Sequence, residues 1–333
     1  MRAIVITKHG DCGVLQVQER PVPVVGPGQV RIAVGAAGVN FADLMARVGL
    51  YADAPEPPCV VGYEVAGTVA EVGEGVDGIV VGERVLAGTQ FGGYAEQVVV
   101  GAGDIVPLPE GMSFEEGAAI PVNYSTAWAG LFDYGALRAG QRVLVHAAAG
   151  GVGIAATQLA KHAGAEVHGT ASPGKHDAIR GFGVDRAIDY TRDGWERDAG
   201  PYHVIMDAIG GASFKRSYAL LVPGGRLIAF GASSVMNGER RNLAKAAPQA
   251  LRMLRGFNLM EQMQESKAVI GLNMLTLWKA RRTLEPWITP LRDRIDDGTI
   301  RPVIAEAVPF ERAGDAHRLI GERRNVGKVV LVP

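Results

Sequence analysis

A run of very small residues at positions 148–153, Ala-Ala-Gly-Gly-Val-Gly, has the composition of a turn that can bind phosphate groups. The preceding residues 142–146 are mostly β-branched and aliphatic, as a strand buried on both faces requires. From Ile154 the apolar residues recur at helical spacing, and a second strand begins at Ala165. Strand, turn and helix in this order allow backbone N–H groups and the helix N-terminus to hold a pyrophosphate. The stretch therefore predicts a dinucleotide-binding βαβ unit; the alternative is a turn whose small residues serve packing alone.

The end of the second strand indicates which dinucleotide is bound. NAD-binding folds usually carry an Asp or Glu there for the ribose hydroxyls, but residues 169–172 hold no acid and the next one is Asp177. An acid would repel a 2′-phosphate, whereas Ser172 and Lys175 can bind one. The pattern favours NADPH over NADH, although both residues are also compatible with an ordinary solvated loop.

Composition limits the other function classes. A chain of 333 residues that is 47% hydrophobic predicts about two domains. Its 34 Lys and Arg balance 35 Asp and Glu, so no general footprint for nucleic acid is expected. Residues 1–10 are typical of a strand, not of a signal peptide, and no apolar run approaches the ~20 residues of a membrane span. We expect a cytoplasmic protein without a transmembrane segment.

The pattern of strands and helices divides the chain into two domains. Residues 1–120 contain short strands separated by glycine and proline turns, which predicts a mainly β lobe. Residues 121–273 alternate six strands with helices, which predicts an α/β domain with a Rossmann-type doubly wound parallel sheet. Beyond it we expect a helix at 277–297, a strand at 303–307, a helix at 311–321 and a strand at 328–332. These must return to the first lobe, so residues 1–120 plus 274–333 form one domain, with residues 121–273 inserted in it.

Several longer motifs carry a family resemblance. They are GVNFADLMARVGLY (38–51), GYEVAGTVAEVGEGV (62–76), AAIPVNYSTAW (118–128), VLVHAAAGGVG (143–153) and NVGKVVLVP (325–333). Together they resemble the zinc-independent quinone oxidoreductase branch of the medium-chain dehydrogenase/reductase superfamily, over essentially the whole chain. Within it, FADLMARVGLY and RNVGKVVLVP are most similar to the vesicle amine transport protein homologues, whose enzymatic role is less settled. The resemblance implies that the mainly β domain is a GroES-like catalytic domain.

The resemblance also indicates whether the chain can hold a catalytic zinc ion. Zinc alcohol dehydrogenases of this superfamily hold their catalytic zinc at positions that match Asn40, Tyr63 and Val122. None of these side chains is a thiolate or an imidazole, the ligands that Zn²⁺ prefers. The resemblance therefore implies no metal, and Asp43 and Glu64, which remain from the motifs, are expected to be hydrogen-bonding residues of the cleft wall.

Without a Lewis acid, hydride from nicotinamide needs an acceptor that is already electrophilic, a quinone or an α,β-unsaturated carbonyl. By resemblance, Asn40 donates a hydrogen bond to the substrate oxygen and Tyr51 supplies the proton. The alternatives are that Asn40 only satisfies buried backbone and that Tyr51 only packs on the nicotinamide face.

The cofactor contacts of the relatives map onto five regions of this chain. One residue touches the nicotinamide side, the glycine turn lines the pyrophosphate, the strand ends clamp the 2′-phosphate, a backbone segment reaches the carboxamide, and an asparagine near the C-terminus is a further candidate. These residues are Thr126, Gly150, Gly151, Val152, Ser172, Lys175, Tyr190, Gly231, Ala232 and Asn325.

Three further features have two interpretations each. His146 lies inside a buried strand and favours a satisfied core histidine over a catalytic one, and Asp207 favours orienting its adjacent turn over proton transfer. Residues 242–264 are Met-rich and amphipathic, which indicates either a lipid or hydrophobic-substrate surface or packing over the cleft mouth. Residues 267–272 come last in the predicted sheet, and such an apolar edge must be covered. The resemblance implies that it pairs with its own copy in a homodimer; the alternative cover is the Met-rich segment.

Two functions follow from these patterns. The first is an NADPH-dependent reductase, which the phosphate turn, the pair Lys175 and Tyr190, and the residues Asn40 and Tyr51 favour. The second is an NADPH-binding, non-catalytic protein with a lipid, membrane or partner-binding role, which the vesicle-protein resemblance allows.

Overall fold

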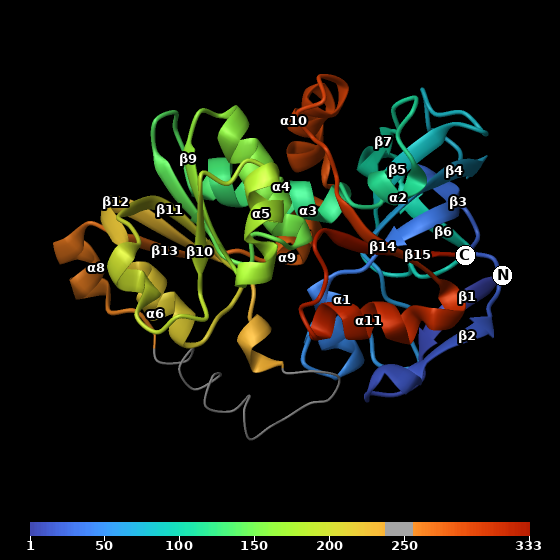
Figure 1. The fold of residues 1–333 in the computed structure, drawn as a ribbon. Helices are drawn as coiled ribbons and strands as arrows, with labels where there is room; N and C mark the ends of the chain where they lie inside the picture. Colours follow the sequence, from blue (N-terminus) through green and yellow to red (C-terminus); the bar gives the residue numbers. More distant parts are fainter. Residues whose placement is uncertain (237–255) are drawn as a thin grey trace. The chain divides into compact units, whose positions relative to one another are not determined.

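A computed structural model describes residues 1–236 and 256–333. The described chain forms two compact units: residues 1–125 with 275–333, and residues 126–236 with 256–274 (Figure 1). The sequence predicts these boundaries at residues 120 and 274. Helix α3 (Pro121–Trp128) carries the first boundary, because Ser125 belongs to one unit and Thr126 to the other.

The second unit is built on six parallel strands, as the sequence predicts. Their order across the sheet is β10-β9-β8-β11-β12-β13. The chain begins in the middle, moves outward through β8, β9 and β10, and then returns to add β11, β12 and β13 on the other side. The order therefore reverses between β8 and β11, and in such sheets ligands bind beyond the carboxyl ends of the strands at this point. The strands are β8 (Arg142–Val145), β9 (Glu166–Ala171), β10 (Arg186–Asp189), β11 (Tyr202–Asp207), β12 (Leu221–Ala229) and β13 (Ala268–Gly271).

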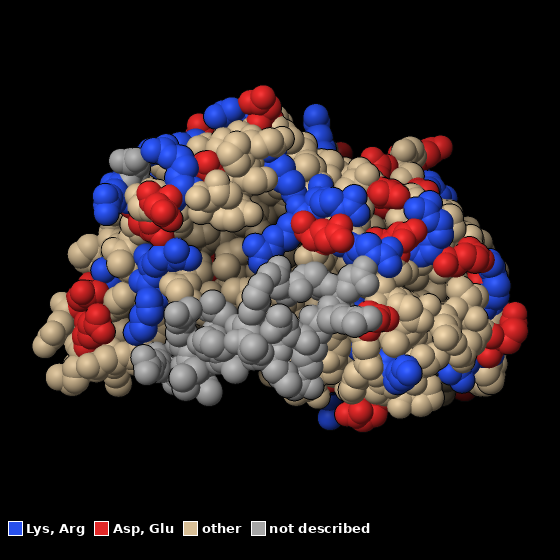
Figure 2. Space-filling view, turned by 60° about the horizontal axis from the view of Figure 1, so that its bottom comes forward, with Lys and Arg blue, Asp and Glu red and all other residues tan. Residues whose placement is uncertain are grey.

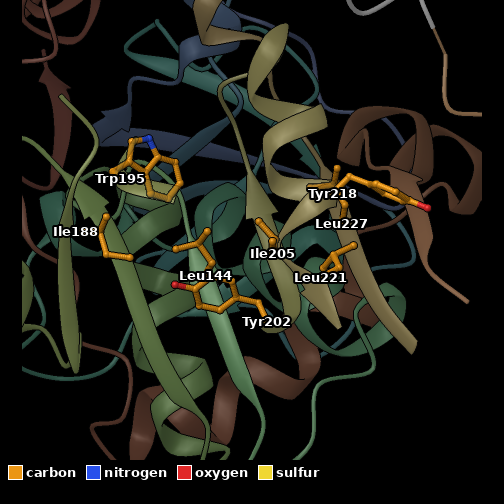
Figure 3. Packing of buried hydrophobic residues seen from close by; sticks show 8 residues of the cluster. All are labelled: Leu144, Ile188, Trp195, Tyr202, Ile205, Tyr218, Leu221 and Leu227. Carbon is orange, nitrogen blue, oxygen red and sulfur yellow. The ribbon is translucent and has the colours of Figure 1, made fainter. Parts of the chain in front are cut away.

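Helices and a tight core complete this unit. Figure 1 shows the sheet flanked by α4 (Gly151–His162), α5 (His176–Gly181) and α6 (Ala212–Ala219). In Figure 3 the side chains of Leu144, Ile205 and Leu227, from three neighbouring strands, gather with aromatic residues, and none of the three is exposed. Burying aliphatic side chains of this size contributes about 1.5–3 kcal/mol each. The core thus holds in place the strands whose carboxyl ends carry the predicted nucleotide contacts.

Strand β13 lies at the edge of the sheet, as the sequence predicts. It pairs with β12 through the register Leu227↔Val269 and Ile228↔Ile270, and among the described residues it has no second partner strand. The short helix α8 (Leu259–Glu265) precedes it, and its side chains Leu259, Met260 and Met263 are all exposed. Residues 242–255 of the predicted amphipathic stretch lie outside the described residues.

The first unit combines strands from both ends of the chain. Its main sheet has the order β14-β15-β3-β4-β5-β7, with β6 also paired to β3, and β1 and β2 form a separate antiparallel pair. Strand β15 pairs with β3 through Val330↔Gly38 and Leu331↔Ala37, so the last residues of the chain lie in the same sheet as this N-terminal strand. The strands are β1 (Arg2–Ile6), β2 (Leu15–Glu19), β3 (Gln29–Gly38), β4 (Glu64–Val72), β5 (Arg84–Gly88), β6 (Gln97–Gly101), β7 (Ile105–Pro107), β14 (Ile304–Pro309) and β15 (Lys328–Val332).

One predicted helix of this unit is wrong in its extent. Instead of a single helix at 277–297, the chain forms α9 (Met274–Arg281) and α10 (Glu285–Asp296). Arg282 takes a left-handed conformation with φ 62°, and Pro286 follows at a position where a continuing helix would need its missing N–H. Asp104 holds the break, because its carboxylate accepts hydrogen bonds from the Leu284 N–H at 2.6 Å and the Trp278 indole at 3.2 Å. The remaining helices here are α1 (Phe41–Arg47), α2 (Phe114–Gly117) and α11 (Ala313–Gly321).

Charge and hydropathy of the folded chain agree with its balanced composition. Figure 2 shows basic and acidic side chains interspersed on the face that it presents, outside the grey atoms. No helix among the described residues combines the length and the apolar character that crossing a bilayer requires.

Candidate functional site

The small-residue turn after β8 places the N-terminus of α4 at the switch point of the sheet. Gly150 is the residue before the helix, and its N–H donates to the Ala147 carbonyl at 2.9 Å. The Ala148 N–H donates to the Thr170 carbonyl at 3.1 Å, which fastens the turn to the neighbouring strand β9. The first backbone N–H groups of a helix have no acceptor within it, and here they belong to Gly151, Val152 and Gly153. This is the arrangement that binds phosphate oxygens.

Gly153 lies in close contact with the backbone of the turn. A Cβ added at this residue would lie 2.4 Å from the Ala147 carbonyl oxygen and 2.7 Å from the Ala148 Cα, and neither backbone atom can yield cheaply. Glycine therefore lets the helix begin close against the strand end. At Gly150 the same added atom would lie 3.4 Å from the Ala147 oxygen, an ordinary contact. Close packing accounts for Gly153 but not for Gly150.

The ends of β9 and β10 bring the predicted phosphate-binding residues to one edge of the sheet. The parallel register pairs Asp189 with Ala171, so the next residues, Tyr190 and Ser172, leave the sheet side by side. Lys175 follows in a short 3-10 turn in which its N–H donates to the Ser172 carbonyl at 2.9 Å. Partial burial lowers the pKa of the Lys175 ammonium from its usual value. The structure thus brings Ser172, Lys175 and Tyr190 together at the strand edge.

The ends of β11 and β12 form a second backbone edge. Gly231 lies so close to the preceding loop that an added Cβ would be 2.8 Å from the Ala208 carbonyl oxygen. The Ser233 N–H donates to the same oxygen at 3.0 Å, so the segment with Gly231 and Ala232 is fixed beside the end of β11. Thr126, the predicted contact on the nicotinamide side, is buried in α3.

His146 and Asp207 are structural residues, as the sequence favours. The His146 ring makes 3.0 Å hydrogen bonds to the hydroxyl groups of Thr170 and Ser217, and burial lowers its pKa. Asp207 is fully buried and accepts hydrogen bonds from the Ile209 N–H at 2.8 Å and from the Ser217 hydroxyl at 2.7 Å. These contacts use the polar atoms of both side chains in holding strands and the following turn.

In the first unit, the partly exposed Asn40 contacts two buried charged residues. Its Nδ2 donates to Glu64 Oε1 at 2.9 Å, and its Oδ1 accepts from the Lys328 ammonium at 2.7 Å. Lys328 also forms an ion pair with Glu64 Oε1, and the side chains of both are almost completely buried. The second Glu64 oxygen accepts the Val122 N–H at 2.7 Å. Asn40 is therefore held through its side chain, and not only through nearby backbone.

Asp43 belongs to a second, adjoining network. Its carboxylate accepts hydrogen bonds from the Asn40 N–H at 2.8 Å, the Gly62 N–H at 3.0 Å and the Tyr94 hydroxyl at 3.0 Å. The side chain is completely buried, and this desolvation raises its pKa to about 7 against those hydrogen bonds. The Tyr94 hydroxyl lies 3.3 Å from His317 Nε2, which continues the network across the unit.

His317 is the neutral end of this network. The Arg47 Nε donates to His317 Nδ1 at 3.3 Å, which requires that nitrogen to be an unprotonated acceptor. Burial first and the Arg47 charge second hold the pKa of this histidine well below its usual value. The network therefore connects a carboxyl whose pKa is raised with an imidazole whose pKa is lowered.

Tyr51 lies against a second tyrosine. The ring centroids of Tyr51 and Tyr63 are 6.3 Å apart with the rings nearly perpendicular, and Phe91 packs on the other side of Tyr63 at 5.2 Å. Burial and the nearby Asp43 raise the pKa of Tyr63. Its hydroxyl group is buried and makes no hydrogen bond of standard geometry within the described residues. Tyr51 itself is partly exposed.

Three residues match the zinc-ligand positions of the dehydrogenases that the chain resembles. Asn40 offers an amide, Tyr63 a phenol of raised pKa, and Val122 an apolar side chain, whereas zinc prefers thiolate and imidazole. Asn325, predicted as a cofactor contact, lies in the turn before β15, where its Nδ2 donates to the Gly327 carbonyl at 2.8 Å.

Comparison with known proteins shows the family of the chain. Family profiles described as "Alcohol dehydrogenase GroES-like domain" and "Zinc-binding dehydrogenase" match residues 26–110 and 182–331. The synaptic vesicle membrane protein VAT-1 homolog of Danio rerio is 40% identical over 337 residues, covering 99% of this chain and 69% of that protein. The chain belongs to the medium-chain dehydrogenase/reductase superfamily. The fold predicted from the sequence is thereby confirmed, with a parallel sheet in one unit and a GroES-like domain in the other.

Solved structures of this superfamily are similar over their full length. A human VAT-1 homolog-like protein has a TM-score of 0.85 and 30% identity, covering all of this chain and 98% of that one. The quinone oxidoreductase of Escherichia coli, solved in complex with NADPH, also has a TM-score of 0.85, with 28% identity and full coverage of both chains. These relatives support an oxidoreductase of the NADP(H)-binding kind.

The sequence did not single out Lys328, Tyr94 or His317, three of the polar residues around Asn40 and Asp43. Lys328 begins a strand whose other residues are nearly all buried, and a lysine in such a strand is a signal that an acid must lie nearby. Tyr94 and His317 have no comparable signal, because they come from segments 223 residues apart. Only the fold brings them to Asp43.

The raised pKa of Asp43 predicts a specific dependence of stability on pH. The folded protein binds a proton between about pH 4 and pH 7 that the unfolded chain does not, so this group's contribution to stability falls as pH rises through that range. Asp43→Asn removes this contribution, which changes by up to about 1.4 kcal/mol per pH unit. Chemical unfolding of both proteins from pH 4.5 to 8 is the measurement. Because His317 is present in both, its opposite dependence cancels in the difference, and parallel pH curves would contradict the assignment.

Proposed function

We propose that this protein is an NADPH-dependent reductase that transfers hydride to a quinone or an α,β-unsaturated carbonyl without a metal. The observation that carries the proposal comes from the second unit. Its parallel sheet places both the glycine turn before α4 and the residues Ser172, Lys175 and Tyr190 at the carboxyl ends of its strands. Gly150, Gly151 and Val152 would hold the pyrophosphate, Lys175 and Tyr190 the 2′-phosphate. Gly231, Ala232 and Thr126 would contact the nicotinamide end, and Asn325 is a further cofactor contact. The NADPH complex of the similar E. coli protein supports NADPH as the cofactor.

The reaction requires little covalent chemistry from the protein. NADPH, when bound, supplies a hydride, which leaves as two electrons and a proton and yields NADP⁺. A quinone that accepts the hydride and one proton from solvent or Tyr51 becomes a hydroquinone, and an enone becomes a saturated ketone. The negative charge that develops on the acceptor oxygen needs a hydrogen-bond donor. The remaining N–H of the Asn40 amide is our candidate for this donor, since its other N–H and its oxygen are held by Glu64 and Lys328.

The donors at the zinc positions support the metal-free part of the proposal. The amide of Asn40, the phenol of Tyr63 and the side chain of Val122 do not form a zinc ligand set. The acceptor must therefore be electrophilic before it binds, which is the reason for proposing quinones and enones over simple aldehydes or alcohols.

The decisive experiment is turnover with a panel of acceptors. We expect NADPH oxidation with a naphthoquinone, a phenanthrenequinone or a linear enone, and no reaction with an unconjugated ketone. Activity should be unchanged by a chelator, and elemental analysis should find no stoichiometric zinc. Tyr51→Phe distinguishes the proton donors, because turnover should fall only if the tyrosine hydroxyl supplies the proton. Absence of turnover with every acceptor, or loss of activity on chelation, would refute the proposal.

Lys175 predicts the preference for NADPH. A hydrogen bond to a charged group contributes about 1.5–3 kcal/mol, so Lys175→Ala should weaken NADPH binding about 10- to 100-fold and leave NADH binding nearly unchanged. Fluorescence titration with both nucleotides measures this. Lys161→Ala is the matched control, because Lys161 pairs with Asp185 on the surface of the same unit. Equal affinities of the unchanged protein for NADPH and NADH would contradict the prediction.

A second function is favoured by one surface feature. The exposed side chains Leu259, Met260 and Met263 on α8 suit an NADPH-binding, non-catalytic protein that contacts lipid or a partner. The relatives named as vesicle membrane proteins are compatible with it. Tight NADPH binding without turnover, together with NADPH-sensitive cosedimentation with lipid vesicles, would favour this function over a cytoplasmic reductase.

The open edge of β13 predicts a homodimer. The Leu272 N–H donates to the Ala229 carbonyl of the preceding strand at 2.9 Å. Because N–H groups alternate in direction along a strand, the N–H of Ile270 also points toward β12, and those of Val269 and Gly271 point away from it, toward the open edge. We propose that this edge pairs with its own copy across a two-fold axis. Val269→Pro removes one N–H from the open edge, and Ile270→Lys places a charge on strand β13. Both substitutions should weaken the dimer, as measured by sedimentation. Val269→Ala, which retains the N–H, should not, and a monomeric unchanged protein at micromolar concentration would refute the model.

A further inference from the structure

The strand β15 buries a lysine in the part of the first unit where related dehydrogenases hold zinc. Lys328 is only 4% exposed, although the ammonium group is strongly hydrated in water. Taking such a charge out of water costs several kcal/mol unless an opposite charge and further hydrogen bonds compensate it. Here Glu64 provides the opposite charge and the Asn40 oxygen provides a hydrogen bond at 2.7 Å.

The cluster also determines the orientation of the Asn40 amide. The ammonium of Lys328 can only donate, so it binds the amide oxygen, and the Glu64 carboxylate can only accept, so it binds the amide nitrogen. The second Glu64 oxygen is occupied by the Val122 N–H. A flipped amide would place two donors together and two acceptors together. Lys328 and Glu64 therefore select one orientation and direct the second N–H of Asn40 away from the cluster.

We propose that Lys328 is a positioning residue that supplies, in place of a metal ion, the fixed positive charge behind the Asn40 amide. A cation at the amide oxygen draws electron density from the nitrogen, so the second N–H becomes a stronger donor toward an oxygen that gains negative charge. Two of the three positions that match zinc ligands, Asn40 and Val122, contact Lys328 or its partner Glu64 directly. This inference rests on the proposed reductase function, because it assigns the Asn40 amide to the substrate oxygen.

Steady-state kinetics provide the first test. Lys328→Met keeps the length and removes the charge, and kcat should fall about 10- to 100-fold while KM for the quinone changes little, since the interaction strengthens only as charge develops. Lys328→Arg should restore part of kcat. Because Lys328 acts through Asn40, the double variant Lys328→Met with Asn40→Ala should be no slower than Asn40→Ala alone. The control Lys161→Met removes a surface lysine of the other unit and should leave kcat unchanged.

A binding measurement tests the same residue without turnover. A hydroxynaphthoquinone that is ionised at neutral pH resembles the product anion, and tryptophan quenching with NADP⁺ present reports its affinity. We expect Lys328→Met to weaken this binding about 10- to 100-fold, with NADP⁺ affinity unchanged. Lys328→Met combined with Glu64→Gln, which leaves no buried charge unpaired, shows whether the loss persists when the stability of the fold is restored.

The outcomes separate this inference from the proposed function. If the unchanged protein reduces no acceptor but binds the anion, and Lys328→Met weakens that binding, the reductase proposal fails. The inference that Lys328 strengthens the Asn40 amide as a donor is then retained. If the unchanged protein turns over and Lys328→Met does so equally fast, or binds the anion equally well, the role of Lys328 is overturned. Failure of the unchanged protein to bind the anion at all also overturns it. Additive losses in the double variant would show that Lys328 does not act through Asn40.

Discussion

The pairing of β15 with β3 is the constraint on which the first unit depends. It brings Lys328 to Asn40 and Glu64, which are 288 and 264 residues away along the chain. The buried ion pair and the pairing of the two strands reinforce each other. The strand pairing fixes the position of Lys328 along the sheet, and the ion pair offsets the free-energy cost of burying its charge. Breaking such a pair from one side typically costs about 3–5 kcal/mol, since an uncompensated charge remains.

Asn40 connects this ion pair to the second buried network. Its side chain is held by Lys328 and Glu64, whereas its backbone N–H donates to Asp43. Asp43 in turn fixes the Gly62 backbone before β4 and orients the Tyr94 hydroxyl. The two networks thus hold the end of β3, the beginning of α1 and the segment before β4 in one arrangement, and Asn40 lies between the first two of these.

In the second unit close backbone packing holds the strand ends, whereas in the first unit buried charged groups hold them. Gly153 and Gly231 each bring a backbone segment nearer to its neighbour than a side chain would permit. The buried ring of His146 is satisfied internally, by the hydroxyl groups of Thr170 and Ser217. In this unit close backbone packing and internal hydrogen bonds together hold the segments at the strand ends.

Features that depend on residues close together in the chain could be predicted from the sequence, and features that depend on distant residues could not. The βαβ unit, the six-strand sheet, the edge position of β13 and the return of the C-terminal segment were predictable, because periodicity, turn residues and strand order are local patterns. The break between α9 and α10 was not, because it depends on Asp104, a residue 180 positions from the Leu284 N–H that it binds. The sequence by itself determined that Asn40 stands where related proteins have a zinc ligand. Only the tertiary structure decided that a buried ammonium contacts it, since burial of a charge becomes acceptable only once folding supplies its distant partners.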